Sequence, residues 1–420
     1  MTFQQVHWNK NDLERRLCHA LNFAELAVKR LAIHGYIDKN EPGNSVRAEK
    51  VISEAAFLLF VASTAPPSME LRTRINSVAQ VLIPHARSER MLLGACLEPA
   101  LALDYAQAHI CLKRLGYPDG DFDEVLRRSG LSQTQAGRER TPHRVLEQEW
   151  LREGTAQQKS KRISLIARKC GLNWPMDLLR GSREDFYAFT HALMYISDFN
   201  VCKRRLPRRR SVILEEAEGA LARCLDEEDY DLVGEILLAW PLTGRSWSAA
   251  SVFGFRVLAH IEDQVGFLPA SSTHIATLHG LHNDDRSDHF VATAYHTVFV
   301  MGLLCAVALQ PKRTPPVAPP TNAEALSCSD WLFALIDTDG KKTLWREEAN
   351  LLNKPQRDAL CGFLLNVAIR RRVNSRDFSG VRDLLERAYR LGLANTPASS
   401  QAAEMLDRMA TFAKIRSTSV

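Results

Sequence analysis

Nineteen consecutive residues without a formal charge, Val291 to Leu309, narrow the folds open to this 420-residue chain more than any other stretch. An apolar helix of this length can cross a membrane or lie at the centre of a helical protein. Tyr295, His296 and two threonines interrupt the run, which favours a buried central helix and no membrane partner. A helix that is apolar on all sides needs other helices around it.

Amphipathic helical patterns fill most of the remaining chain. After Asn11 and Asp12, either of which can cap a helix, apolar residues recur at spacings of three and four as far as Leu31. Strand-like alternation is nearly absent, and loops rich in Pro and Gly separate the helical patterns. We therefore predict an all-α fold of antiparallel helical hairpins. The further helices are predicted near 46–64, 69–84, 88–114, 122–129, 143–153, 160–169, 183–200, 211–226, 229–239, 247–264, 289–309, 322–336, 343–373, 377–391 and 399–414.

Two segments interrupt the helical pattern. Residues 131–161 are polar with a weak helix inside, and residues 311–322 are rich in proline and cannot be helical. These segments divide the chain into an N-terminal part (1–130), a central part with the candidate site (162–310) and a C-terminal part (323–420). Helices can still close one ring across both segments.

Composition limits the class of protein. Hydrophobic residues make up 45% of the chain and charged residues 25%, which is typical of a soluble globular protein. A formal net charge of +5 is too small to indicate nucleic-acid binding by itself. Nine cysteines occur without a CxxC pair, mostly in apolar helical patterns where a reduced thiol packs as a small hydrophobe. These features predict a reducing, cytoplasmic location.

The helix expected near 183–200 carries three candidate polar side chains. His191 and Tyr195 lie one turn apart on one face, and Asp198 follows three residues later. A histidine that is held by a carboxylate and points inward can act as a base or a metal ligand. In the alternative interpretation, His191 is a hydrogen-bonded core residue and Asp198 is a helix-end group.

Two further helices carry polar groups among apolar residues. Asp231 and Glu235 are one turn apart, and a buried pair of this kind needs partners, although both can be solvated surface charges instead. Tyr295 and His296 open the uncharged run, where burial is costly unless a polar group has a partner or a purpose. Gln264 lies just before a Gly and a Pro that stop a helix.

Four short stretches carry a resemblance to a known group of proteins: THALMYISDFN, DYDLVGEIL, EDQVGFLP and AYHTVFVMGLLCA. Over roughly residues 185–310, the chain resembles a little-characterised group of actinobacterial helical proteins whose Q-x-G-x-x-P corner and helix pairs are similar to α/α-toroid folds. In such folds, paired helices form a ring and the central opening holds substrate or metal. Asn200 stands where Gly is expected after SDF. The resemblance implies a site that includes His191, Asp198, Asp231, Gln264, Tyr295 and His296.

A cluster of six cations follows the first of these stretches. Pro207 prevents the cluster from forming a smooth helix, and its charges can attract an anion or stay solvated beside nearby acids. No aromatic residue is interleaved, which disfavours nucleic acid as a partner. An acidic carrier protein with a phosphopantetheine arm fits better, steered by a basic rim at the mouth of the cavity. The six residues are Lys203, Arg204, Arg205, Arg208, Arg209 and Arg210.

Cys202 lies between the candidate site and these cations. A thiol beside cations can become a nucleophilic thiolate if a histidine supplies the base. We therefore favour carrier-protein-dependent acyl transfer that forms an amide or ester bond in specialised metabolism such as antibiotic biosynthesis. The acyl group would pass to Cys202 or directly to an amine, with His191 or His296 moving protons. No tightly bound cofactor is expected. Residues assigned to substrate binding are Tyr195, Asp231, Glu235 and Gln264, and those assigned to catalysis also include Asp198 and Tyr295.

Two alternatives stay open. The first is a metal-dependent enzyme with a mixed nitrogen and oxygen ligand set suited to Zn or Fe. Its ligands would be His191, His296 and one of Asp198, Asp231 or Glu235. The second is a non-catalytic helical scaffold, in which these polar groups only fix packing.

Overall fold

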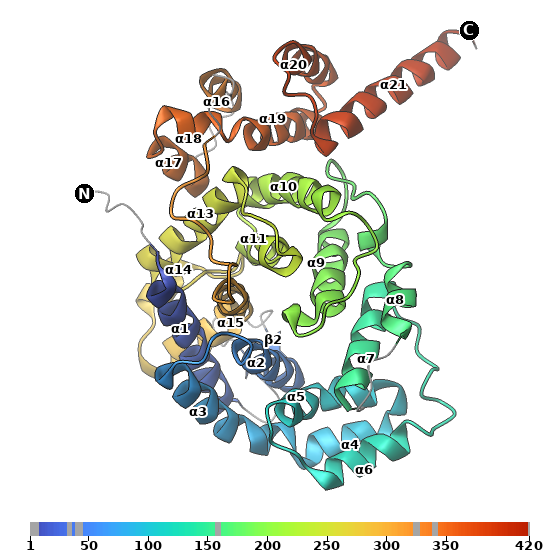
Figure 1. Ribbon diagram of the computed structural model, residues 1–420, viewed down its shortest axis with the longest axis vertical. Helices are drawn as coiled ribbons and strands as arrows, with labels where there is room; N and C mark the ends of the chain where they lie inside the picture. Colours follow the sequence, from blue (N-terminus) through green and yellow to red (C-terminus); the bar gives the residue numbers. More distant parts are fainter. Residues whose placement is uncertain are drawn as a thin grey trace.

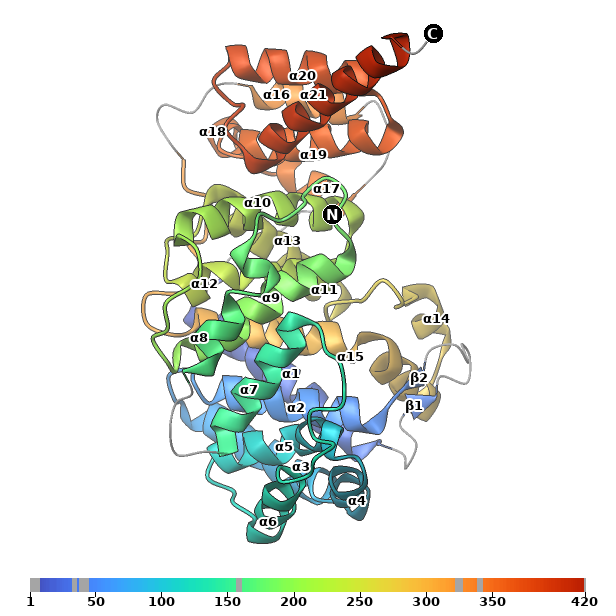
Figure 2. The same cartoon turned by 90° about the vertical axis from the view of Figure 1, so that its right-hand side faces the viewer.

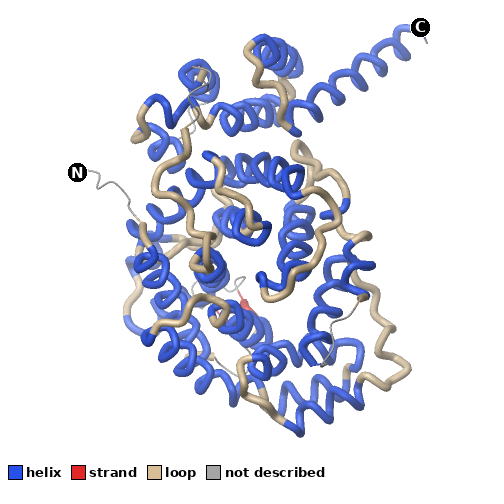
Figure 3. Tube along the Cα trace, in the orientation of Figure 1, coloured by secondary structure: helices blue, strands red, loops and turns tan. Residues whose placement is uncertain are grey.

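The computed structural model describes residues 8–31, 36–37, 45–155, 161–321, 328–337 and 343–418, and it confirms the all-α class (Figure 1). Figure 3 shows that helix dominates this part of the chain. The one strand pairing among the described residues joins Tyr36–Ile37 (β1) to Ser45–Val46 (β2). The helices are α1 (Lys10–Lys29), α2 (Ala48–Ala62), α3 (Met69–Ala86), α4 (Glu89–Leu97), η1 (Pro99–Leu101), α5 (Ala102–Arg114), α6 (Gly120–Ser129), α7 (Pro142–Thr155), α8 (Arg162–Ala167), η2 (Gly171–Asn173), α9 (Arg183–Ser197), η3 (Asp198–Asn200), α10 (Arg210–Glu227), α11 (Tyr230–Leu237), α12 (Ala239–Thr243), α13 (Ala249–Val265), α14 (Ile275–Gly280), α15 (Asn283–Ala308), α16 (Ser329–Asp337), α17 (Leu344–Asn350), α18 (Lys354–Asp358), α19 (Cys361–Ser375), α20 (Phe378–Arg390) and α21 (Pro397–Thr418).

Capping side chains and prolines set the helix ends. Asn9, rather than Asn11 or Asp12, caps α1, because its Oδ1 accepts hydrogen bonds from the backbone N–H groups of those two residues at 2.7 and 3.2 Å. Pro99 divides the single helix expected over 88–114 into α4 and α5. The helix expected over 343–373 is likewise divided into α17, α18 and α19.

The uncharged run forms most of α15, which lies in the core as expected. The span Asp284–Ala308 is long and apolar enough to cross a membrane, but 89% of its most apolar window is buried inside the protein. α15 packs along α1 and also contacts α2 and α11. Gly302 allows this close approach, since a Cβ there would lie 2.6 Å from Cβ of Ala20 on α1.

Helices from the first two parts of the chain share one core. α2 contacts α5, α5 contacts α7, α7 contacts α9, α9 contacts α11, α11 contacts α15, and α15 contacts α2. The segment expected to be a joint, 131–161, contributes α7 to this set, apart from its residues 156–160, which lie outside the described residues. It therefore does not separate two cores.

The C-terminal helices form a group at one end of the molecule (Figure 2). Residues 311–321 are non-helical, as expected, and lead to this group, while residue 322 lies outside the described part. α19 and α21 contact α10, and α17 contacts α13. Cys328 and Cys361 form a disulfide, contrary to the expectation of reduced thiols, whereas the other seven cysteines are free.

Candidate functional site

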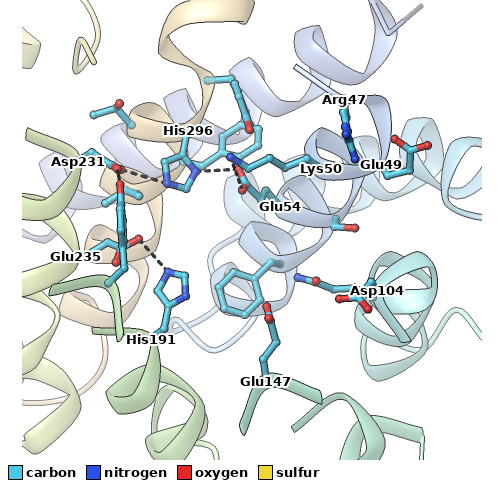
Figure 4. Close-up of a pocket in the computed structure, with 18 of the residues that line it drawn as sticks. Arg47, Glu49, Lys50, Glu54, Asp104, Glu147, His191, Asp231, Glu235 and His296 are labelled. Carbon is cyan, nitrogen blue, oxygen red and sulfur yellow. Dashed lines mark hydrogen bonds and ion pairs between the residues drawn. The ribbon is translucent and has the colours of Figure 1, made fainter. Parts of the chain in front are cut away.

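A polar pocket of about 1290 Å³ lies between the six helices α2, α5, α7, α9, α11 and α15 (Figure 4). Side chains of both charges line it, together with tyrosines and two phenylalanines, Phe57 and Phe299. Pockets of this size hold small molecules, and a few polar groups in them fix a ligand's orientation. The ionisable lining residues used below are Glu54, His143, Arg144, Glu147, Arg183, Tyr187, His191, Tyr195, Asp231, Glu235, Tyr295 and His296.

Three of the predicted residues meet in the wall of this pocket. Asp231, Glu235 and His296 each offer one ligand atom, and these atoms lie within 4.8 Å of one another. The two carboxylates come from successive turns of α11, and the imidazole comes from α15. Gly234 lets the two helices approach closely, because a Cβ there would lie 2.5 Å from Cγ1 of Val300. We call these three residues the triad.

His296 lies between two carboxylates. Its Nδ1 is 2.8 Å from Oε2 of Glu54, and its Nε2 is 3.2 Å from Oδ1 of Asp231. Burial alone would lower the pKa of His296, but the charges of Asp231 and Glu54 raise it to about 10. Burial opposes ionisation of Glu54, yet the adjacent imidazolium holds its pKa below the usual value. When no metal cation is bound at the triad, His296 is therefore protonated at neutral pH.

Two side chains hold the carboxylate of Asp231 in place through its Oδ2 atom. The Tyr187 hydroxyl donates a short hydrogen bond to Oδ2, and Nη2 of Arg183 lies 3.3 Å from the same atom. Oδ1, which faces His296, accepts no hydrogen bond of good geometry from the described residues. Burial raises the pKa of Asp231, and the nearby charge of His296 opposes that rise.

Glu235 is held by two residues of α9. The Thr190 hydroxyl donates to Oε2, and Nε2 of His191 lies 3.4 Å from Oε1. Burial would raise the pKa of Glu235, but His191 lowers it below the usual value. Nδ1 of His191 is buried and has no hydrogen-bond partner among the described residues, and neither has Oγ1 of Thr297 on the same pocket wall.

The opposite side of the pocket contains a second acidic group. The Tyr195 hydroxyl donates to Glu147 at 2.6 Å, and Arg144 donates to the other oxygen of that carboxylate at 2.8 Å. Tyr195 therefore lines the pocket, as expected, although it contacts Glu147 and not the triad. Tyr295 also lines it, and burial followed by the charge of Glu54 raises the pKa of its phenol.

Asp198 does not face the pocket, contrary to the prediction. It follows the last turn of α9 with φ of 47°, a left-handed conformation, and its carboxylate is buried. There it accepts hydrogen bonds from Nη2 of Arg114 at 3.1 Å and from Nε1 of Trp150 at 2.6 Å. These partners lie on α5 and α7, and Asp198 is not part of the pocket lining. Cys202, which is buried, and Gln264, which is exposed, do not line the pocket either.

The six clustered cations are also absent from the pocket lining, so they do not form the expected basic rim. Two of them are committed to ion pairs elsewhere. Arg204 pairs with Glu153, and Arg208 makes a bidentate pair with Glu216 at 2.7 and 2.6 Å. Bidentate pairs of this kind fix a side chain in place.

Sequence reasoning missed four residues that support the site: Glu54, Tyr187, Thr190 and Glu147. Glu54 follows Lys50 by one turn, a spacing that also suits an exposed ion pair, and the two charged atoms do lie 3.7 Å apart. One signal was available, since Glu54 directly precedes the long apolar stretch AAFLLFVA of α2.

Comparison with known proteins gives one family. The model of "Domain of unknown function (DUF6895)" matches residues 19–306, which is more than half of the chain. The match runs from within α1 to near the end of α15, so it includes the triad and the helices around the pocket. No curated protein and no solved structure matches the chain.

Proposed function

The chain belongs to the DUF6895 family, and we propose that it is a metal-dependent enzyme whose triad holds a divalent cation in the pocket. The observation that carries this proposal is the convergence of Asp231, Glu235 and His296, with ligand atoms within 4.8 Å of one another. One imidazole and two carboxylates form a mixed nitrogen and oxygen set suited to Zn or Fe.

The partners of the triad support the proposal. Metal-binding histidines commonly donate their second ring N–H to a carboxylate, which fixes the tautomer and aims the other nitrogen at the metal. Glu54 is placed to accept this hydrogen bond from Nδ1 of His296 at 2.8 Å. The ligating carboxylates are oriented in the same way, Asp231 by Tyr187 and Glu235 by Thr190.

A cation held there would polarise an oxygen of a bound substrate and make a water molecule more acidic. His191 is the residue placed to move a proton. Its Nε2 is oriented by Glu235, and its Nδ1 is left without a protein partner at the pocket wall. Because both charged and aromatic side chains line the pocket, the substrate class that fits is a small polar molecule.

We also propose that the fold is an α/α-toroid-like ring. The cyclic contacts from α2 through α5, α7, α9 and α11 to α15, and back to α2, support this arrangement, as does the position of the pocket among these helices. In a toroid, the inner helices surround the site, and here those helices would contribute the triad and its partners.

The metal is tested on protein purified without added metal. Elemental analysis should find close to one transition-metal ion per chain, because a tight site retains its ion. Asp231→Ala and His296→Ala should each lower the metal content and weaken Zn²⁺ binding at least about tenfold in calorimetry. Glu147→Gln, which changes a pocket carboxylate outside the triad, should bind as the wild type does.

Two results would overturn the proposal. One is a wild-type content below about 0.2 metal per chain together with no measurable Zn²⁺ or Fe²⁺ binding. The other is unchanged affinity in both triad variants when circular dichroism shows them to be folded. Either result would favour a scaffold role for the pocket residues.

Acyl transfer from a carrier protein is the weaker proposal. The form with Cys202 as nucleophile and the six clustered cations as docking rim uses residues that all lie outside the pocket lining. Direct transfer of the acyl group to an amine needs no cysteine, but it lacks the same basic rim. No contact among the described residues favours it over metal-dependent chemistry.

A further inference from the structure

The charged side chains that line the pocket differ between its interior and its mouth. Three of the lining carboxylates, Glu147, Asp231 and Glu235, are buried, with at most 8% of each side chain exposed. The lining cations are all exposed, and none belongs to the cluster over 203–210. The six lining cations are Arg47, Lys50, Arg90, Arg138, Arg144 and Arg183. Positive charge in this pocket therefore gathers where a ligand enters.

Four of these six cations already have a carboxylate partner. The pairs are Lys50–Glu54, Arg90–Glu49, Arg144–Glu147 and Arg183–Asp229. Arg47 and Arg138 make no ion pair within the part of the chain that the structure describes. Two positive charges at the mouth are thus left for a ligand.

The carboxylates on this side of the pocket do not neutralise the two arginines. Asp104 accepts hydrogen bonds from Arg140 at 2.6 Å and from Gln148 at 3.1 Å. Burial raises the pKa of Asp104, and the charges of Arg140 and Arg138 oppose the rise, which places Arg138 close by. Glu184 is exposed and lines the pocket without an ion pair to a described residue, but it belongs to the first turn of α9, on a different wall from α2.

One face of α2 leads from the mouth to the triad. Arg47 is the N-cap residue of this helix, and Lys50, Glu54 and Phe57 follow at helical spacings of four and three. Figure 4 shows Arg47, Lys50 and Glu54 in succession toward His296. Phe57 is 9% exposed, so the same face ends in an apolar surface. A ligand along α2 can therefore have one end at Arg47 and the other at the triad.

We propose that the substrate of this pocket is an organic anion, whose carboxylate or phosphate group is bound at the mouth by Arg47 while its reacting group lies at the triad. Arg138 adds to the positive potential at the mouth. This assignment rests on the proposed metal-dependent function and names the class of its substrate. A guanidinium group suits either oxyanion, because it can donate two parallel hydrogen bonds to it. Positive charge around a pocket mouth also steers anions toward it.

Four probes that share one ring separate charge from shape: benzoate and phenyl phosphate are anions, benzamide is neutral, and benzylamine is a cation. Their affinities are measured by saturation-transfer NMR titration of the full chain, both loaded with Zn²⁺ and metal-free. At least one anion should bind about fivefold or more tightly than benzamide, and benzylamine should bind most weakly. The tighter anion tells a carboxylate site from a phosphate site. Raising NaCl from about 50 to about 500 mM should weaken that anion several-fold but not benzamide.

Arg47→Gln should weaken the preferred anion about fivefold or more and leave benzamide and Zn²⁺ binding unchanged. Arg47→Lys retains the charge and should keep most of the preference, and adding Arg138→Gln to Arg47→Gln should weaken the anion further. The matched control is Arg205→Gln. It removes one exposed positive charge outside the pocket lining, so it should bind all four probes as the wild type does.

A wild type without a preference for either anion overturns the proposal, and so does a wild type that binds neither. Unchanged anion affinity in Arg47→Gln overturns it as well. The metal site is judged by Zn²⁺ binding alone. A chain that binds no metal, but whose anion preference is lost in Arg47→Gln, would refute the metal site and support the anion site.

Discussion

Two histidines of the pocket, His296 and His143, have pKa values shifted in opposite directions, because their neighbours differ. His296 has a carboxylate on each nitrogen, whereas His143 on α7 is buried near two cationic groups, Arg144 and His191. Burial, followed by those two charges, lowers the pKa of His143 to about 4. A histidine in an unfolded chain has a pKa of about 6.5. The folded protein therefore resists protonation of His143 between these two values.

This difference predicts how stability depends on pH. Between pH 6.5 and 4, the unfolded state binds more protons at this residue, so the free energy of unfolding falls as the pH falls through that window. From about pH 8 to about pH 5, the wild type should lose about 2 kcal/mol more than His143→Gln in urea denaturation. Exposed His274→Gln is the control and should follow the wild type. Parallel curves for wild type and His143→Gln would contradict the assignment.

The sequence predicted pocket residues correctly where the face of a helix decides whether a side chain points into the pocket. His191, Asp231, Glu235 and His296 were predicted because polar groups inside apolar helices need partners, and all four line one pocket. Asp198 fitted the same periodicity, yet the chain leaves the helix at that residue with φ of 47°. Helical spacing does not apply beyond the last helical turn, so its direction could not be predicted.

At the scale of secondary structure, the close packing of α11 against α15 sets the relative position of the triad residues. Gly234 on α11 faces Val300 on α15, and a Cβ at Gly234 would lie 2.5 Å from Cγ1 of that valine. Valine is restricted at χ1 and cannot move aside easily. The distance between the triad carboxylates and His296 therefore depends on the glycine.

Gly234→Ala should push α11 away from α15. We expect a loss of about 1–3 kcal/mol in the free energy of unfolding, from overpacking, and at least about tenfold weaker Zn²⁺ binding. Gly254→Ala on α13 is the matched control. Its Cβ would lie 3.1 Å from a methyl carbon of Leu221, outside the pocket lining, so stability should fall without a change in metal affinity. Normal Zn²⁺ binding by Gly234→Ala would show that the approach of the helices does not set the site.

Most helices could be predicted, and their ends could not. Apolar spacing of three and four predicted the elements around the pocket, because each buries one face. The spacing continues through Pro99 and Pro355, yet the chain ends a helix shortly before each proline, α4 at Leu97 and α17 at Asn350. α14 was missed because its six residues are too few to show a period.

At the scale of the whole molecule, buried ion pairs join the C-terminal helices to the rest. Glu348 on α17 is 2% exposed, and it accepts from Nε of Arg256 at 2.8 Å and lies 2.9 Å from Nδ1 of His260. Both partners lie on α13, so this carboxylate links the family domain to the part of the chain beyond the match. The sequence could not predict this contact, because nothing in helical spacing tells which distant helix supplies a partner.

Glu348→Ala should leave Arg256 buried without its partner. We expect a loss of about 3–5 kcal/mol in the free energy of unfolding and faster hydrogen exchange in α16 to α21. Exposed Glu347→Ala should change neither, and both variants should keep the metal affinity of the wild type. Unchanged exchange in the C-terminal helices of Glu348→Ala would show that this ion pair does not hold the two parts together.

The position of α15 in the chain has a consequence for synthesis. α1 and α2 leave the ribosome first, but the helix against which both pack is completed only at Ala308. At about 5–20 residues per second, their apolar faces wait roughly 12 to 50 seconds for that partner. The nascent chain should therefore bind a chaperone such as a holdase during this interval, and α1 and α2 should reach their final packing only after α15 has emerged.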